Sequence, residues 1–309
     1  LYANYSWFLH QDLLFRYSTK LLRYIFSDYH LWFAIIYSVM VFACLGFINE
    51  FCPRRSNYIP YLLLIFIYWR GFSSIRSNSA MAIMLVALIM LHRKRFFWAI
   101  VFSVCTLLIH KMAFVFFLFM PFYYFFRKGI SLKMASLLIV ASSLFGILFQ
   151  TYFLLYTANM DLGGAYQSYA SRSIGTSFLD GAWKLAFEQI ILGVMMVLFN
   201  KPIKLHIAKL RGLDADRLKL VWLMCLFDMM CIPVNYIMGV WRGYTFFYLP
   251  RLVMWGEVIY LFQCKYVDRS LRVPSDIVIT AAFIAWMVFR FYHMWEDSNL
   301  MPYVFELFI

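Results

Sequence analysis

The segment "RGFSSIRSNSA" (70–80) places two arginines between two uncharged apolar runs, at 58–69 and 81–91. The segment contains no acidic residue that would neutralise Arg70 or Arg76. An arginine presents a planar set of donors that matches the oxygens of a phosphate group. Two such cations beside apolar runs indicate either a site for an anion or side chains that reach lipid headgroups.

Further cations and a histidine stand in comparable positions. They are His110 and Lys111 in "LLIHKMAFVFF", Arg172 in "SYASRSIGTS", and Arg242 and Arg251 in "GVWRGYTFFYLPRLV". Each has an ordinary interpretation as an interfacial residue or, for Arg251, as the ion-pair partner of Glu257. Taken together, the five arginines favour a site for a multiply charged anion.

Acidic residues inside the apolar runs are few. Glu188, Asp228 and Glu257 lie in such runs, where an acid is either a functional group or the counter-ion of an arginine. The "LDAD" segment (213–216) has a spacing that suits a metal, but its basic surroundings favour a solvated loop. The sequence lacks the Walker A, Rossmann, HExxH and GxSxG patterns, and we expect no metal site and no cofactor.

The composition indicates a membrane protein, because 64% of the residues are hydrophobic, 21% are aromatic and the mean hydropathy is +0.74. Soluble domains contain about half apolar residues. We predict an all-α, polytopic fold of about 10–11 transmembrane helices. The ten visible spans are 28–50, 58–74, 77–92, 96–110, 112–126, 131–152, 183–200, 218–236, 247–264 and 275–292.

The charges are distributed unevenly between the turns that join these spans. Most of the 28 Lys and Arg residues fall in alternate turns, which are therefore predicted to be cytoplasmic. This topology accounts for the net charge of +13 without a nucleic-acid partner. Residues 1–309 are expected to form one transmembrane domain. In it, 1–27 face outward after a missing N-terminal helix, and 153–182 form a long periplasmic loop.

The order of these motifs resembles that of a known family. Arg76 and Ala80 open an apolar run, a basic turn follows at 92–95, then "LLIHKMAFVF" and finally "RGYTFFYLP" (242–250). This order, over about 60–265, resembles the EpsG-like branch of the bacterial Wzy-type polysaccharide polymerases.

The resemblance implies a multi-pass protein of the bacterial inner membrane, with a fold similar to the class C glycosyltransferases. It would transfer a glycan from one undecaprenyl diphosphate to the terminal sugar hydroxyl of a second lipid-linked repeat unit, without a metal. The resemblance places Arg76 and His110 in the catalytic site. The acceptor hydroxyl also needs a base, for which His110, Asp12 and His10 are equal candidates. The diphosphate would be held by Arg70, Arg76, Lys111, Arg172, Arg242 and Arg251. Besides this substrate, the implied partners are membrane lipid and a chain-length regulator.

Rival functions remain open. A membrane O-acyltransferase would show a His–Arg pair in its first span, and a lipid-linked glycan flippase would show symmetry between two halves. Neither feature is visible in the sequence. A proton-coupled transporter would depend on Glu188, Asp228 and Glu257.

Overall fold

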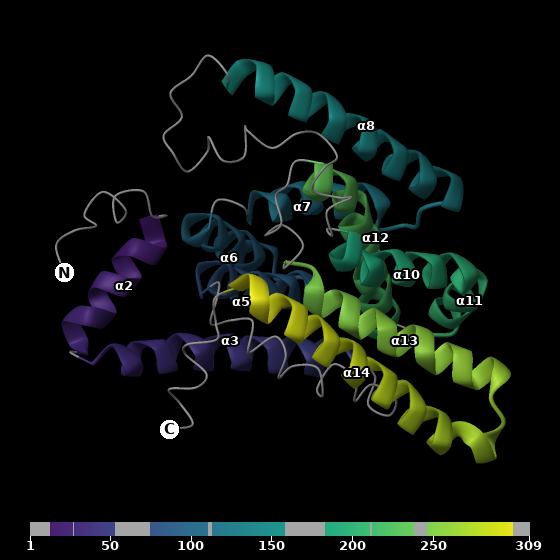
Figure 1. The fold of residues 1–309 in the computed structure, drawn as a ribbon. Helices are drawn as coiled ribbons and strands as arrows, with labels where there is room; N and C mark the ends of the chain where they lie inside the picture. Colours follow the sequence, from purple (N-terminus) through teal and green to yellow (C-terminus); the bar gives the residue numbers. More distant parts are fainter. Residues whose placement is uncertain are drawn as a thin grey trace. The chain divides into compact units, whose positions relative to one another are not determined.

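The structure is a computed structural model and describes residues 13–26, 28–52, 75–110, 113–157, 183–210, 212–237 and 246–298 (Figure 1). Every regular element in these ranges is a helix, and no strand occurs among them. A helix overlaps each predicted span except 58–74, which lies outside the described residues. The all-α prediction is therefore confirmed at this level. Among the described helices, two are long and apolar enough to cross a membrane, or three if the bent pair Gln189–Leu198 and Asn200–Lys209 is one span, so the number of 10–11 transmembrane helices stays a prediction.

The chain divides into two compact units, which are described one at a time below. The first contains residues 1–111 and 255–309, and the second contains residues 112–254. The boundary falls inside helix α13 (Tyr248–Tyr266). The expectation of a single domain stays a prediction.

In the described part of the first unit, two helices are long and apolar enough to cross a membrane. They are α3 (Tyr29–Phe51), over Phe33–Phe51, and α5 (Ile75–His92). Helix α6 (Phe96–Ile109) is also apolar but shorter and packs on α5, while α3 packs on α5 as well. Helices of this length and hydropathy are typical of a helical membrane protein.

Helix α2 (Leu13–Ile25) was not predicted from the sequence. Residues 1–27 were expected only to form an outward-facing segment. The three basic residues of α2, Arg16, Lys20 and Arg23, follow one another at helical spacing, and its buried residue is Phe15. Alternating charged and apolar faces are typical of a helix that lies at a membrane interface. It contacts both α3 and α6.

The rest of the first unit is a pair of helices. The C-terminal part of α13 and helix α14 (Arg272–Ser298) are joined by a short 3-10 turn, Arg269–Leu271. Gln263 donates hydrogen bonds to Ser275 and Asp276 across the pair. The rings of Trp255 and Phe283 meet edge to face, with centroids 5.4 Å apart.

Helix α12 (Leu213–Ile237) is the centre of the second unit. It is contacted by α7 (Phe114–Phe126), α8 (Leu132–Thr157), α10 (Trp183–Leu198) and α11 (Asn200–Lys209). The rings of Phe119, Phe227 and Phe247 form an edge-to-face triangle, which ties α7 and α12 to the segment that begins α13. Their centroids are 5.5–5.7 Å apart, as in well-packed aromatic clusters.

Two details of this unit differ from expectation. The predicted span 183–200 bends by 69° at the junction of α10 and α11, and Pro202 stands in the first turn of α11. A proline is accommodated there, because the first turn needs no internal amide donor, but it does not continue a preceding helix. The "LDAD" segment is not a loop but the start of α12. Its Asp214 and Asp216 lie in the first turn, where acids are favoured by the helix dipole.

Candidate functional site

Three of the predicted site residues lie in the described part of the chain. Arg76 and His110 belong to the first unit, and Arg251 belongs to the second. The other predicted residues, Asp12, Arg70, Lys111, Arg172 and Arg242, lie outside the described residues.

The α5–α6 hairpin brings Arg76 and His110 to the same end. Helix α5 ends at His92, and a tight turn with Lys94 in the left-handed region (φ 59°) reverses the chain before α6 begins at Phe96. The two helices then pack against each other along their length. Arg76 is the second residue of α5 and His110 is the C-cap of α6. Both residues therefore stand at the end of the hairpin opposite the turn.

His110 continues a face of α6 that consists of small residues. Ala99, Ser103 and Thr106 are buried and share this face with His110 at spacings of four, three and four positions. The hydroxyls of Ser103 and Thr106 donate to backbone carbonyls of their own helix. Small residues allow membrane helices to approach closely. His110 is 6% exposed at the end of this face, and its backbone amide donates to the Thr106 carbonyl at 3.0 Å.

The first turn of α5 gathers polar groups at the same end. Arg76 is half-buried, and the next two residues, Ser77 and Asn78, are buried. Ser79 donates to the Ile75 carbonyl at 2.7 Å. The first turn of a helix carries free amide groups and the positive end of the helix dipole. With a guanidinium in that turn and an imidazole at the same end, this site has the chemistry to bind an anion and to exchange a proton.

A second polar cluster lies in the interior of the second unit. Arg251 of α13 and Asp228 of α12 are 0% and 1% exposed, and the Arg251 Nε lies 2.9 Å from the Asp228 Oδ2. Gln189 of α10 is also buried and donates from Nε2 to the same carboxylate oxygen at 3.0 Å. The Arg251 guanidinium lies 5.1 Å from the centroid of the Tyr248 ring. The cluster links three helices through one carboxylate.

This cluster resolves the alternatives that the sequence left open for Asp228. The acid is a counter-ion, and the arginine that it neutralises is Arg251. The ion pair described for Arg251 is with Asp228. Glu257, the alternative partner considered from the sequence, lies six residues after Arg251, a poor spacing for one helix face. Gln189 was missed, although an amide in the middle of an apolar run was a visible signal, since a buried polar group requires a partner.

A third cluster, also missed from the sequence, lies at the turn end of the α5–α6 hairpin. Glu50 of α3 accepts two hydrogen bonds from Arg93, at 2.7 and 3.1 Å, and lies 2.9 Å from the Nδ1 of His92. The hydrogen bonds to Glu50 raise the pKa of Arg93 above its usual value. These contacts join the end of α3 to the turn between α5 and α6. Arg76 and His110 lie at the opposite end of the same hairpin.

Comparison with known proteins gives one match. No curated protein and no solved structure matches the chain. The sequence model of the EpsG family matches residues 1–305. This match confirms the resemblance that the sequence indicated. Because it spans nearly the whole chain, the protein belongs to the EpsG family.

Proposed function

We propose that this membrane protein joins oligosaccharide repeat units that are carried on undecaprenyl diphosphate. Membership of the EpsG family supports a polysaccharide-polymerase type of role. The terminal sugar hydroxyl of one lipid-linked repeat attacks the anomeric carbon of the other. A new glycosidic bond forms, and the bond between the anomeric carbon and the diphosphate oxygen breaks. Undecaprenyl diphosphate leaves with the electron pair, and the hydroxyl proton passes to a base.

One observation carries this proposal: Arg76 and His110 stand at the same end of the α5–α6 hairpin. The leaving diphosphate gains negative charge in the transition state, and a preplaced guanidinium at a helix N-terminus stabilises that charge. An imidazole titrates near neutral pH and is suited to accept the hydroxyl proton. We assign the diphosphate contact to Arg76 and the proton transfer to His110, with Asp12 and His10 as the other candidate bases.

The remaining cations are assigned by their surroundings. Arg70, Lys111, Arg172 and Arg242 are proposed to contribute to the diphosphate site. Arg251 is assigned to the interior instead, because its side chain is fully buried and its guanidinium already faces a carboxylate. We therefore assign Arg251 to the ion pair with Asp228 inside the second unit rather than to the diphosphate site.

The setting of this reaction is part of the proposal. The fold would be of the class C glycosyltransferase kind, with multiple passes through the bacterial inner membrane and the site on its outer face. The arginines would stabilise the diphosphate without a divalent metal, so the reaction should continue in the presence of a chelator. The glycan donor would be a polyprenyl diphosphate and not a nucleotide sugar.

The proposal is tested by an activity assay in detergent. Purified protein is given a synthetic undecaprenyl-diphosphate oligosaccharide together with a chelator, and no nucleotide sugar is added. Wild type should yield a ladder of glycans on a gel. Arg76→Ala should lower kcat by about 100-fold or more, the loss typical of one transition-state donor. His110→Ala should lower it by about 100-fold or more, as for a general base.

Arg95→Ala is the matched control, because Arg95 is an exposed arginine at the turn end of the same hairpin. It should keep the wild-type rate. The proposal fails if wild type gives no ladder while binding the lipid, or if Arg95→Ala is as damaging as Arg76→Ala. Binding without polymerisation would indicate a flippase.

A further inference from the structure

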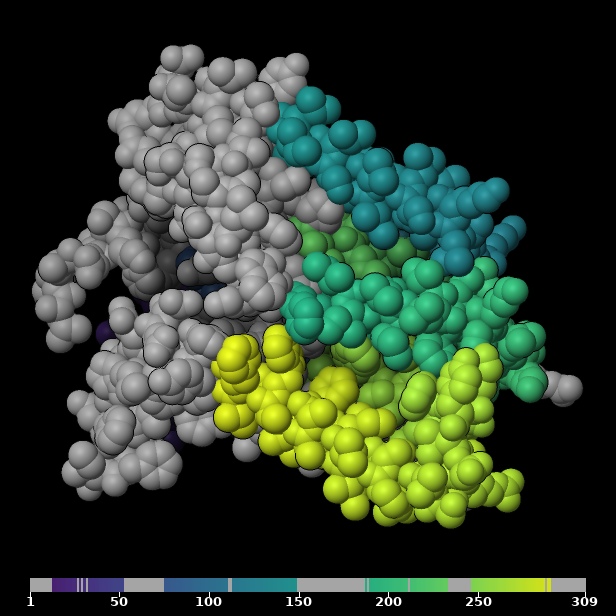
Figure 2. Space-filling model, turned by 45° about the vertical axis from the view of Figure 1, so that its right-hand side comes forward, coloured from purple at the N-terminus to yellow at the C-terminus, as the bar shows by residue number. Residues whose placement is uncertain are grey.

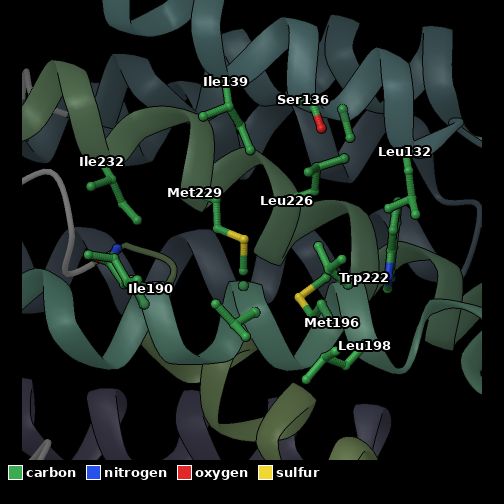
Figure 3. Close-up of a pocket in the computed structure, with 15 residues that line it drawn as sticks. Leu132, Ser136, Ile139, Ile190, Met196, Leu198, Trp222, Leu226, Met229 and Ile232 are labelled. Carbon is green, nitrogen blue, oxygen red and sulfur yellow. The ribbon is translucent and has the colours of Figure 1, made fainter.

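The second unit contains an apolar pocket between α8, α10 and α12. Its volume is about 440 Å³, within the range of about 300–1,000 Å³ that small-ligand sites occupy. Figure 3 shows Leu132, Trp222 and Leu198 at one end of the pocket, and Ile190 and Ile232 at the other. In Figure 2, α8 (teal) and α10 (green) lie on either side, with part of α12 between them. Four of the α10 residues that line the pocket, Ile190, Val194, Val197 and Leu198, are exposed.

The lining contains few polar groups, and one of them lacks a partner. Ser136, Gln189 and Trp222 are the polar residues among aliphatic and methionine side chains. Trp222 is 9% exposed, and its indole Nε1 has no hydrogen-bond partner among the described residues. A buried indole N–H is normally hydrogen-bonded. The pocket therefore suits an apolar ligand that carries an acceptor oxygen at the Trp222 end.

Three lysines are close in sequence to lining residues at the same end of the pocket. Lys133 follows Leu132, Lys201 lies three positions after Leu198, and Lys219 lies one helical turn before Trp222. Lys133 and Lys201 are exposed, Lys219 is half-buried, and none of the three forms an ion pair with a described residue. Basic residues at the end of a pocket between membrane helices bind anionic lipid headgroups.

We propose that this pocket, defined by α8, α10 and α12, binds an anionic glycerophospholipid from the leaflet that faces the basic turns. One acyl chain lies in the apolar pocket. The phosphate lies among Lys133, Lys201 and Lys219, and the Trp222 Nε1 donates to an ester carbonyl oxygen of the lipid. This lipid is distinct from the proposed substrate and does not depend on the proposed reaction.

Native mass spectrometry of the delipidated protein tests this inference. The probes are phosphatidylglycerol and phosphatidylcholine with identical palmitoyl and oleoyl chains. Phosphatidylglycerol should bind at least about 10-fold more tightly, given the attraction that each lysine near an anionic headgroup supplies. Changing Lys133, Lys201 and Lys219 together to Gln should abolish this preference. The control changes Lys128, Lys204 and Lys209 to Gln, which removes the same charge from exposed positions of the same unit and should leave the preference unchanged.

The apolar part is tested by filling the pocket. Ser136→Phe should weaken both lipids, whereas Leu137→Phe, at an exposed neighbouring position that does not line the pocket, should not. Trp222→Phe keeps an aromatic ring, although a smaller one, and removes the Nε1 donor. It should weaken both lipids several-fold and provides a second measurement if Ser136→Phe does not fold. Equal binding of the two lipids, or an equal effect of the control lysines, would overturn the inference. So would displacement of phosphatidylglycerol by an equal amount of undecaprenyl phosphate, because the pocket would then hold the substrate chain.

Discussion

Replacing Asp228 by Asn should strongly destabilise the second unit. The substitution keeps the size of the side chain but leaves the Arg251 guanidinium, which is 0% exposed, without the carboxylate 2.9 Å from its Nε. Removing one member of a buried ion pair costs about 3–5 kcal/mol, because the other charge stays buried without that counter-ion. Asn keeps an oxygen that can accept from Gln189, so that hydrogen bond adds little to the loss.

Replacing both members tests the physical reason. Asp228→Leu together with Arg251→Met substitutes apolar groups of similar size for the pair. Such exchanges are often neutral or stabilising, because the cost of burying two charges disappears. The loss of stability in the double variant should therefore be smaller than the summed losses of the single variants Asp228→Leu and Arg251→Met. We expect a coupling free energy of at least about 2 kcal/mol between the two positions.

Unfolding in mixed micelles, by titration of dodecyl sulfate into a mild detergent, measures the free energy of unfolding for each variant. Asp214→Asn is the control, since Asp214 is an exposed acid of the same helix with a 3.4 Å ion pair to Arg217. A pair whose acid is solvent-exposed in this way contributes less than about 1 kcal/mol. Additive losses in the double variant, or an Asp228→Asn loss no larger than that of Asp214→Asn, would refute the reasoning.

Three further predictions concern packing. Glu50→Gln removes the carboxylate that pairs with Arg93 in the turn after α5. The free energy of unfolding should fall by about 1 kcal/mol, because this ion pair is partly exposed. A loss as large as that of Asp228→Asn would contradict this. A Cβ on Gly193 would lie 3.0 Å from the Met229 sulfur, so Gly193→Val should cost about 1–3 kcal/mol in the same titration, and Met229→Ala should relieve it. Ser103→Leu should separate α6 from α5 and lower the rate in the ladder assay, and unchanged activity would contradict a role for this packing in placing the candidate base.

The helices were largely predictable, because long uncharged runs between basic turns have few alternatives. The run 77–92 is α5 (Ile75–His92), and 96–110 is α6 (Phe96–Ile109). Helix α2 was missed because its charges lower the mean hydropathy of the segment, although their helical spacing was visible. The bend after α10 was also missed, since Pro202 was counted within a basic turn.

The site was predictable only where neighbouring elements determine it. A short turn makes adjacent helices antiparallel, so Arg76 and His110 were bound to share an end of their hairpin. The pairing of Asp228 with Arg251 depends on which faces of α12 and α13 meet. Apolar residues occur on all faces of both helices, so the hydrophobic periodicity of the sequence did not show which faces meet.

The most direct test of block polymerisation is the molar ratio of undecaprenyl diphosphate released to glycosidic bonds formed. The purified protein is given a lipid-linked oligosaccharide without nucleotide sugar, and the lipid and the glycan are quantified by mass spectrometry. Our account predicts one undecaprenyl diphosphate for every new bond, with both quantities falling together in Arg76→Ala and His110→Ala. Glycan growth without a matching release of undecaprenyl diphosphate would contradict it.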